Sequence, residues 1–284
     1  MDLRLAVFTV QLYDLTPEEA AAELQRLGYD GVEWRVTNLP ASIPANRNFW
    51  NGNVCTFEID RIAEEAQRLR GLSEAHGLAL PTLGTYLDCR RLDQVEACAR
   101  AAKAIGVRML RVGLPGWNHE LPYDDAFVAA RQAWSEAAAV VGQQGVKTLI
   151  ELHHNSLLPT ASAVRRFLDG HSPEQVGVIY DPGNMVHEGW EHPQIVIGVL
   201  GPYLAHVHVK NARWLAAGEE QGTARWRGEM CRLREGQVFW PDILAALQRS
   251  GYHGWFATED FGPGDSREKL ADNLAALRDW AARL

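Results

Sequence analysis

Four residues of this chain have the types and the placement of a donor set for a metal ion. Glu151, Asp181, His208 and Glu259 each close a short apolar segment. A carboxylate at the end of a buried strand is costly unless it is paired, protonated or bound to a metal. Three carboxylates and one imidazole form an oxygen-rich set that suits a hard divalent cation better than a thiolate-loving metal. We therefore predict one bound divalent ion, with manganese, magnesium, cobalt and zinc all left open.

Each of these residues also has a simpler interpretation. Glu151 alone fits a solvated strand end, and Asp181 followed by Pro182 and Gly183 fits a turn. His206 and His208 alone fit histidines that are satisfied within a core. The repetition of the pattern at the ends of four successive apolar segments favours a metal site over these separate interpretations.

The elements that must position these residues follow a simple alternation. Short apolar segments alternate with longer amphipathic segments rich in Ala, Leu, Arg and Glu. The strands are expected at 5–10, 31–35, 79–85, 107–112, 146–152, 177–181, 205–209 and 255–259. The helices are expected from residue 16 and at 60–76, 93–105, 124–144, 160–169, 193–200, 241–250 and 267–282.

Eight such strand–helix units predict an α/β fold, a single (β/α)8 TIM barrel that spans residues 1–284 as one domain. An open doubly wound sheet would need a glycine-rich phosphate loop after an early strand, and the sequence has none. In a barrel, neighbouring strands deliver their terminal side chains to one mouth, which brings the four proposed ligands together.

Two insertions lengthen the predicted barrel, at about 36–59 and 211–236. Both follow a strand and precede a helix, so both lie on the face where barrel enzymes carry their chemistry. Phe49 and Trp50 in the first, and Trp214 and Trp226 in the second, make them richer in aromatic residues than disordered loops. We expect both insertions to act as lids.

Composition narrows the range of partners. The formal charge is −8 over 284 residues, and the basic residues are scattered. Duplex nucleic acid and anionic membranes both need a cationic face, so neither is an expected partner. The sequence has no apolar run of the ~20 residues that a membrane helix needs, and no signal peptide at its start.

The four cysteines form no CxxC pair and are typical of free thiols. We expect a cytoplasmic protein with a small-molecule substrate. A homo-oligomer is compatible with such a barrel, but no pattern fixes an interface.

Several motifs carry a resemblance to a known family. They are Gly28-Tyr29-Asp30-Gly31-Val32-Glu33, Ile150-Glu151, Asp181-Pro182-Gly183-Asn184, His206-Val207-His208-Val209-Lys210, and Gly251-Tyr252-His253-Gly254-Trp255 with Glu259. With them the chain resembles, over nearly its whole length, the xylose-isomerase-like sugar isomerase/epimerase superfamily. This superfamily includes the ketose 3-epimerases, inosose dehydratases and apurinic endonucleases. The resemblance implies that Glu151, Asp181, His208 and Glu259 bind one divalent ion, and that Glu151 and Glu259 also act as catalytic base and acid.

The expected activity is isomerisation or epimerisation of a sugar or related polyhydroxy carbonyl compound. The metal would stabilise an enediolate while a proton moves next to the carbonyl. The candidate substrate-binding residues are His153, His187, Lys210, Arg213, Glu33 and Trp117.

The chain departs from the ketose 3-epimerase pattern at three positions. Asn184 replaces a histidine, Leu157 replaces a second glutamate, and Trp214, beside Arg213, falls where an arginine is expected. A lyase that dehydrates a keto-inositol or cleaves a 3-keto-glycoside is therefore the alternative. An apurinic endonuclease fits less well, because Asn184 stands at an expected ligand position and no basic face is present. The intact quartet argues against a sugar-binding barrel without activity.

Overall fold

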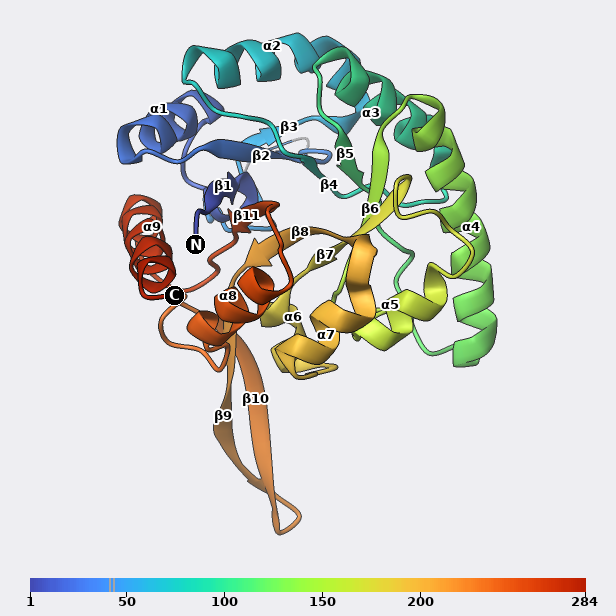
Figure 1. Ribbon diagram of the computed structural model, residues 1–284, viewed down its shortest axis with the longest axis vertical. Helices are drawn as coiled ribbons and strands as arrows, with labels where there is room; N and C mark the ends of the chain where they lie inside the picture. Colours follow the sequence, from blue (N-terminus) through green and yellow to red (C-terminus); the bar gives the residue numbers. More distant parts are fainter. Residues whose placement is uncertain (41, 43) are drawn as a thin grey trace.

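Parallel strands close into a barrel in the computed structural model, which describes residues 1–40, 42 and 44–284 (Figure 1). Around the barrel the strands follow the order β1-β11-β8-β7-β6-β5-β4-β2, and pairing of β2 with β1 closes it. The barrel strands are β1 (Arg4–Phe8), β2 (Gly31–Val36), β4 (Leu83–Thr85), β5 (Met109–Arg111), β6 (Lys147–Glu151), β7 (Val176–Tyr180), β8 (Leu204–Val209) and β11 (Trp255–Thr258). Each overlaps a predicted strand, so the barrel prediction is confirmed.

The helices form an outer ring around the barrel (Figure 1). They are α1 (Pro17–Leu27), α2 (Ile62–Ala75), α3 (Leu92–Ala104), α4 (Tyr123–Gln143), α5 (Ala161–Phe167), α6 (Pro182–His187), α7 (Pro193–Leu200), α8 (Trp240–Arg249) and α9 (Ser266–Ala282). Short 3₁₀ turns lie at Thr9–Gln11, Ile59–Arg61 and Gly201–Tyr203. All the predicted helices are present, and α6 is an additional short helix directly after β7.

Local sequence signals explain where helix α1 begins and ends. The Thr16 hydroxyl accepts a hydrogen bond from the Glu19 amide at 3.2 Å, and the Glu19 carboxylate accepts one from the Thr16 amide at 2.8 Å. This reciprocal cap satisfies two amides that the first helical turn leaves without partners. Gly28 ends the helix in the left-handed conformation, with φ of 86°.

Large buried aromatic residues fix the sheet against the helices that surround it. Trp34, Trp134 and Trp240 are each at most 1% exposed, and each indole N–H has a partner. Trp240, the first residue of α8, donates to the backbone oxygen of Lys210 at 3.2 Å. Helix packing therefore holds the backbone at the carboxyl end of β8, where the candidate site lies.

The first insertion folds against the barrel mouth. It ends in a short strand, β3 (Thr56–Phe57), which pairs with the end of β2. Within it, the rings of Phe49 and Trp50 both lie about 5 Å from Phe261, at 5.0 and 4.9 Å. Positions 41 and 43 of the predicted insertion lie outside the described residues. The described part agrees with the expectation of a loop that covers the mouth.

The second insertion differs from the expected lid. It forms an antiparallel hairpin of β9 (Asn211–Glu220) and β10 (Thr223–Cys231), which projects away from the body of the barrel (Figure 1). Residues 214–227 are exposed. The turn places Gln221 and Gly222 at φ of 54° and 74°, the left-handed pair that matches the twist of a two-residue hairpin. The segment satisfies its backbone by pairing with itself rather than by folding over the mouth.

The base of this hairpin is clamped by Asn211. Its side-chain amide donates to the backbone oxygens of Leu233 and Val238, at 2.8 and 2.9 Å, and its oxygen accepts from the amide of Val238 at 2.9 Å.

Among the described residues, no helix is both long and apolar enough to cross a membrane.

Candidate metal centre

Four strand ends bring the predicted quartet together. Glu151 is the last residue of β6, Asp181 and Glu259 directly follow β7 and β11, and His208 lies one residue before the end of β8. One ligand atom from each residue lies within 4.8 Å of those from the other three. Glu151 is 9% exposed and the others at most 2%. Such a concentration of buried carboxylates requires positive charge nearby.

Two cations on neighbouring strands supply part of that charge. The Lys210 ammonium lies 2.8 Å from Asp181 Oδ2 and 2.5 Å from Glu259 Oε2. The Arg111 guanidinium, at the end of β5, donates to Glu151 Oε2 at 2.5 Å and to the backbone oxygen of Thr85 at 2.9 Å. Three carboxylates thus face two permanent cations and the imidazole of His208. Burial lowers the pKa of His208, but Glu33 and Glu151 raise it well above its usual value, so a divalent ion would take the place of the imidazole proton.

The pKa values of the charged groups at this site are shifted in different directions. Burial raises the pKa of Asp181 to about 7; the Lys210 ammonium opposes this shift, and the carboxylates of Glu151 and Glu259 add to it. Burial also acts on Glu151, but Arg111 and His208 outweigh it and hold the pKa of that carboxyl well below its usual range. Burial lowers the pKa of Lys210, but the carboxylates of Asp181 and Glu259 outweigh burial and raise that pKa above its usual value.

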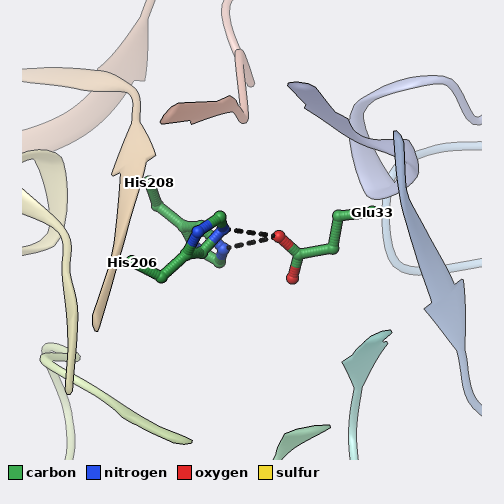
Figure 2. Close-up of side chains that lie close together, drawn as sticks. All are labelled: Glu33, His206 and His208. Atoms are coloured by element: carbon green, nitrogen blue, oxygen red, sulfur yellow. Dashed lines mark hydrogen bonds and ion pairs between the residues drawn. The ribbon is translucent and has the colours of Figure 1, made fainter. Parts of the chain in front are cut away.

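Below the quartet lies a second, deeper polar group. Figure 2 shows the side chains of His206 and His208, from β8, pointing toward the carboxylate of Glu33, from β2. Glu33 Oε2 lies 2.9 Å from His206 Nε2 and 3.2 Å from His208 Nε2. All three residues are fully buried. His208 therefore contacts Glu33 through one ring nitrogen and the quartet through the other.

Above the quartet lies a cavity of about 310 Å³. Glu151, Glu259, Lys210 and Arg111 line its polar wall, and Trp50 and Tyr86 line an aromatic wall. The carboxylates of Glu151 and Glu259 thus face a space large enough for a small molecule, at the end of the barrel where such enzymes act.

The structure separates the predicted substrate-binding residues into two groups. His153 and Lys210 line the cavity. Glu33 does not, because it lies sealed beneath His208. Arg213 pairs with Glu229 across the hairpin at 2.9 Å, so its charge is used within the second insertion.

His187 and Trp117 also lie away from the cavity lining. The His187 ring packs between His154 and Trp214, with ring centroids 4.7 and 6.1 Å away. Trp117 donates to the backbone oxygen of Leu121 and borders a separate cavity of about 200 Å³ beside α4.

Sequence reasoning missed Arg111 and Trp50 as parts of the site. Arg111 carried a usable signal, since it is a charged residue at the end of an apolar strand, like the quartet itself. Asn184 was noted only as a departure from a family pattern. In the structure its amide nitrogen donates to Asp181 Oδ2 at 2.9 Å and to the Leu152 backbone oxygen at 3.1 Å. Asn184 therefore orients the Asp181 carboxylate.

The donor set fits a divalent metal ion. It offers three carboxylates and one imidazole nitrogen from four different strand ends, within the 4.8 Å spread given above. Hard divalent cations prefer carboxylate oxygens, and several also accept an imidazole. Glu151, Asp181, His208 and Glu259 are the residues that would hold it.

The fold and this site define a class of protein. Residues 21–280 match the family described as xylose isomerase-like TIM barrel, and the chain belongs to that family.

Among curated proteins, the chain is 22% identical over 221 residues to the inosose dehydratase of Geobacillus thermodenitrificans, covering 70% of this chain and 72% of that protein. Among solved structures, it resembles the 3-keto-D-glucoside 4-epimerase of E. coli, with a TM-score of 0.72 and 14% identity, over 98% of this chain and 100% of that one. It also resembles a xylose isomerase-like TIM barrel protein of Mycobacterium smegmatis in complex with magnesium, with a TM-score of 0.68 and 16% identity, over 99% and 97% of the two chains. These structural likenesses establish the fold.

Proposed function

We propose that this protein is a divalent-metal-dependent isomerase or epimerase that moves a proton next to the carbonyl of a sugar or related polyhydroxy compound. One observation carries the proposal: Glu151 and Glu259, which belong to the proposed metal quartet, also line the same 310 Å³ cavity. They reach it from β6 and β11, which lie on either side of β7 and β8 in the barrel. A substrate in this cavity contacts two carboxylates from different directions.

The proposed roles follow from these positions. A divalent ion held by the quartet would supply Lewis-acid stabilisation of negative charge on adjacent substrate oxygens. One of Glu151 and Glu259 removes the proton from carbon, and the other returns a proton at the neighbouring position or on the opposite face. Lys210 and His153 bind substrate hydroxyls, while Trp50 and Tyr86 cover an apolar face of the ring and exclude water.

A dehydratase is the second candidate, favoured by the inosose dehydratase name of the curated relative. Leu157 also supports it, because this residue stands where ketose 3-epimerases carry a glutamate and is 2% exposed. In a dehydration, a carboxylate removes the proton from carbon and the carbon–oxygen bond breaks at the neighbouring position. Lys210 lines the cavity and donates a proton to the departing hydroxide, which leaves as water.

We further propose manganese as the first metal to test, and a reducing, cytoplasmic environment. The four cysteines are free and buried, which agrees with that environment.

A deuterium-exchange screen tests the proposed function. The purified protein, with its metal content measured, is incubated in deuterated water with ketoses, keto-inositols and 3-keto-glycosides. Uptake of carbon-bound deuterium with otherwise unchanged composition indicates an isomerase or epimerase, whereas loss of water or of an aglycone indicates a lyase.

Matched variants assign the chemistry to the site. Glu151→Gln and Glu259→Gln should abolish exchange. Glu23→Gln serves as the control, because Glu23 is a largely buried carboxylate that pairs with Arg26 on α1, outside the site. Exchange that persists in both Glu151→Gln and Glu259→Gln would contradict the proposal.

A further inference from the structure

The layer beneath the quartet is unusual for a barrel interior. Barrel cores are normally filled by layers of branched apolar side chains. Here a carboxylate and two imidazoles, from Glu33, His206 and His208, occupy one layer and are fully buried. None of these three side chains is among the residues that line the 310 Å³ cavity. This polar group therefore needs an explanation other than direct substrate binding.

The hydrogen-bond geometry determines where the imidazole protons lie. Both Nε2 atoms approach the same oxygen, Glu33 Oε2, at 2.9 and 3.2 Å. An ionised carboxylate only accepts hydrogen bonds, so each ring must carry its proton on Nε2 to satisfy this contact.

The other nitrogen of His208 faces the quartet. Its Nδ1 lies 3.1 Å from Glu151 Oε1, 3.8 Å from Glu259 Oε2 and 4.0 Å from Asp181 Oδ2. An imidazole binds a metal only through a nitrogen that carries no proton. Without a metal, Nδ1 donates to Glu151 Oε1, so both nitrogens of the His208 ring carry protons. A divalent ion would displace the Nδ1 proton on the side where the three carboxylates converge, while Glu33 keeps the proton on Nε2.

We propose that Glu33 is a positioning residue for the metal centre: by accepting the Nε2–H of His208, it fixes the ring so that Nδ1 faces the quartet and binds an ion that displaces the Nδ1 proton. A carboxylate behind a histidine ligand also raises the basicity of that ligand and strengthens metal binding. His206 donates to the same oxygen and so holds the Glu33 carboxylate in place across the barrel. This inference rests on the metal centre of the proposed function.

A second metal ion between Glu33, His206 and His208 is the competing interpretation, since these residues also offer three ligand atoms close together. The observed distances of 2.9 and 3.2 Å are ordinary hydrogen-bond lengths. None of these three side chains lines the cavity, whereas Glu151 and Glu259 of the quartet do, so an ion from the cavity meets the quartet first. The geometry therefore favours hydrogen bonding.

Two substitutions at Glu33 separate the loss of its charge from the loss of its hydrogen-bond acceptor. In Glu33→Gln the amide oxygen can take the place of Oε2 and accept from both rings, so the acceptor is kept and the charge is lost. In Glu33→Met the acceptor itself is lost at similar volume. Substitution of a residue that orients a metal ligand typically costs about 10–100-fold in affinity. We expect weaker Mn²⁺ binding by about 10-fold for Glu33→Gln and about 100-fold for Glu33→Met.

The experiment measures Mn²⁺ affinity and stoichiometry of the full chain by calorimetry, with thermal unfolding of the metal-free proteins as the check on folding. Glu23→Gln is again the control. A second readout uses Co²⁺-substituted protein, in which the exchangeable Nε2–H of a histidine ligand gives a strongly shifted proton NMR signal. We expect this signal in the unsubstituted protein, protected from exchange with solvent, and its fast exchange or loss in Glu33→Met.

The outcomes separate the two proposals. Unchanged Mn²⁺ affinity in folded Glu33→Gln and Glu33→Met overturns the role of Glu33 and leaves the proposed function standing. Two ions per chain, falling to one in Glu33→Met, overturns it in favour of a second metal site. Absence of any ion in the unsubstituted protein overturns both proposals. If Glu33→Met does not fold, the affinity of Glu33→Gln decides.

Discussion

Ion pairs between basic and acidic side chains lie in opposite surroundings at the barrel mouth and on the hairpin. Lys210 is 3% exposed between Asp181 and Glu259, whereas Arg225, on β10, pairs with Glu220 at 3.3 Å with both side chains more than 60% exposed, at 64% and 62%. Only Lys210 separates β8 from β9, so the chain passes from one setting to the other within a few residues.

This contrast shows that burial, rather than residue type, decides what a charge does here. Exposed ion pairs contribute about 0–1 kcal/mol because water and salt screen them. A buried pair leaves an uncompensated charge when one partner is removed, which costs far more. The charges of the mouth are therefore coupled to each other and to any metal, while those of the hairpin are nearly independent.

Removal of a carboxylate from the quartet should have the largest effect. Asp181→Asn keeps the shape of the side chain and deletes one negative charge, so Mn²⁺ affinity should fall by more than about 100-fold, beyond the usual range for residues that only orient a ligand. Glu220→Gln removes the same charge from the hairpin and should leave affinity unchanged. Calorimetric titration of both variants checks this. Equal Mn²⁺ affinities of the two variants would contradict the proposed difference between the charges of the mouth and those of the hairpin.

Removal of the buried ammonium should destabilise the metal-free protein. Lys210→Met leaves Asp181 and Glu259 without their cation, so the free energy of unfolding should fall by about 3–5 kcal/mol. Added Mn²⁺ should then stabilise the variant more than the unsubstituted protein, because the ion replaces the missing charge. Denaturant unfolding with and without Mn²⁺ measures both effects. A metal-free variant as stable as the unsubstituted protein would show that this pair contributes little.

Two tryptophans extend the comparison to substrate binding. Trp50 and Trp226 are similarly exposed, at 57% and 61%, but only Trp50 lines the cavity. Loss of an aromatic contact of about 0.5–1.5 kcal/mol should raise KM about 2–12-fold in Trp50→Ala, once a substrate is found. Trp226→Ala should leave KM unchanged. A raised KM in Trp226→Ala alone would place the substrate nearer the hairpin.

The smallest effect is expected on the hairpin itself. Arg225→Ala breaks an exposed pair and should leave the thermal midpoint without measurable change at low or high salt. A salt-dependent loss of stability would mean that the hairpin charges are coupled like those of the mouth.

The barrel and the convergence of the quartet were accessible from sequence because both depend on repetition. Strand and helix patterns alternate eight times along the chain, and the ends of parallel barrel strands meet at one mouth whatever the details of packing. The capping residues Thr16 and Glu19 act within a single helical turn, so the start of that helix could also be predicted from the sequence.

The remaining features depend on three-dimensional detail. Glu33 was expected beside the substrate, but its depth follows from strand tilt and stagger, which one strand does not reveal. Arg213 was expected to face the substrate, but its pairing with Glu229 depends on the register of a hairpin that was not predicted. The turn at Gln221 and Gly222 lacks the Asn-Gly signal that would have indicated it.

The clamped base of the hairpin has a practical consequence for protein engineering. Asn211 ties the start of β9 to the backbone at Leu233 and Val238, so the ribbon beyond it is anchored independently of its tip. The turn at Gln221–Gly222 lies at the end of the hairpin that projects from the barrel (Figure 1). A fluorophore, an affinity tag or a whole domain inserted at this turn would be held away from the barrel by the hairpin, which leaves the mouth free for metal and substrate.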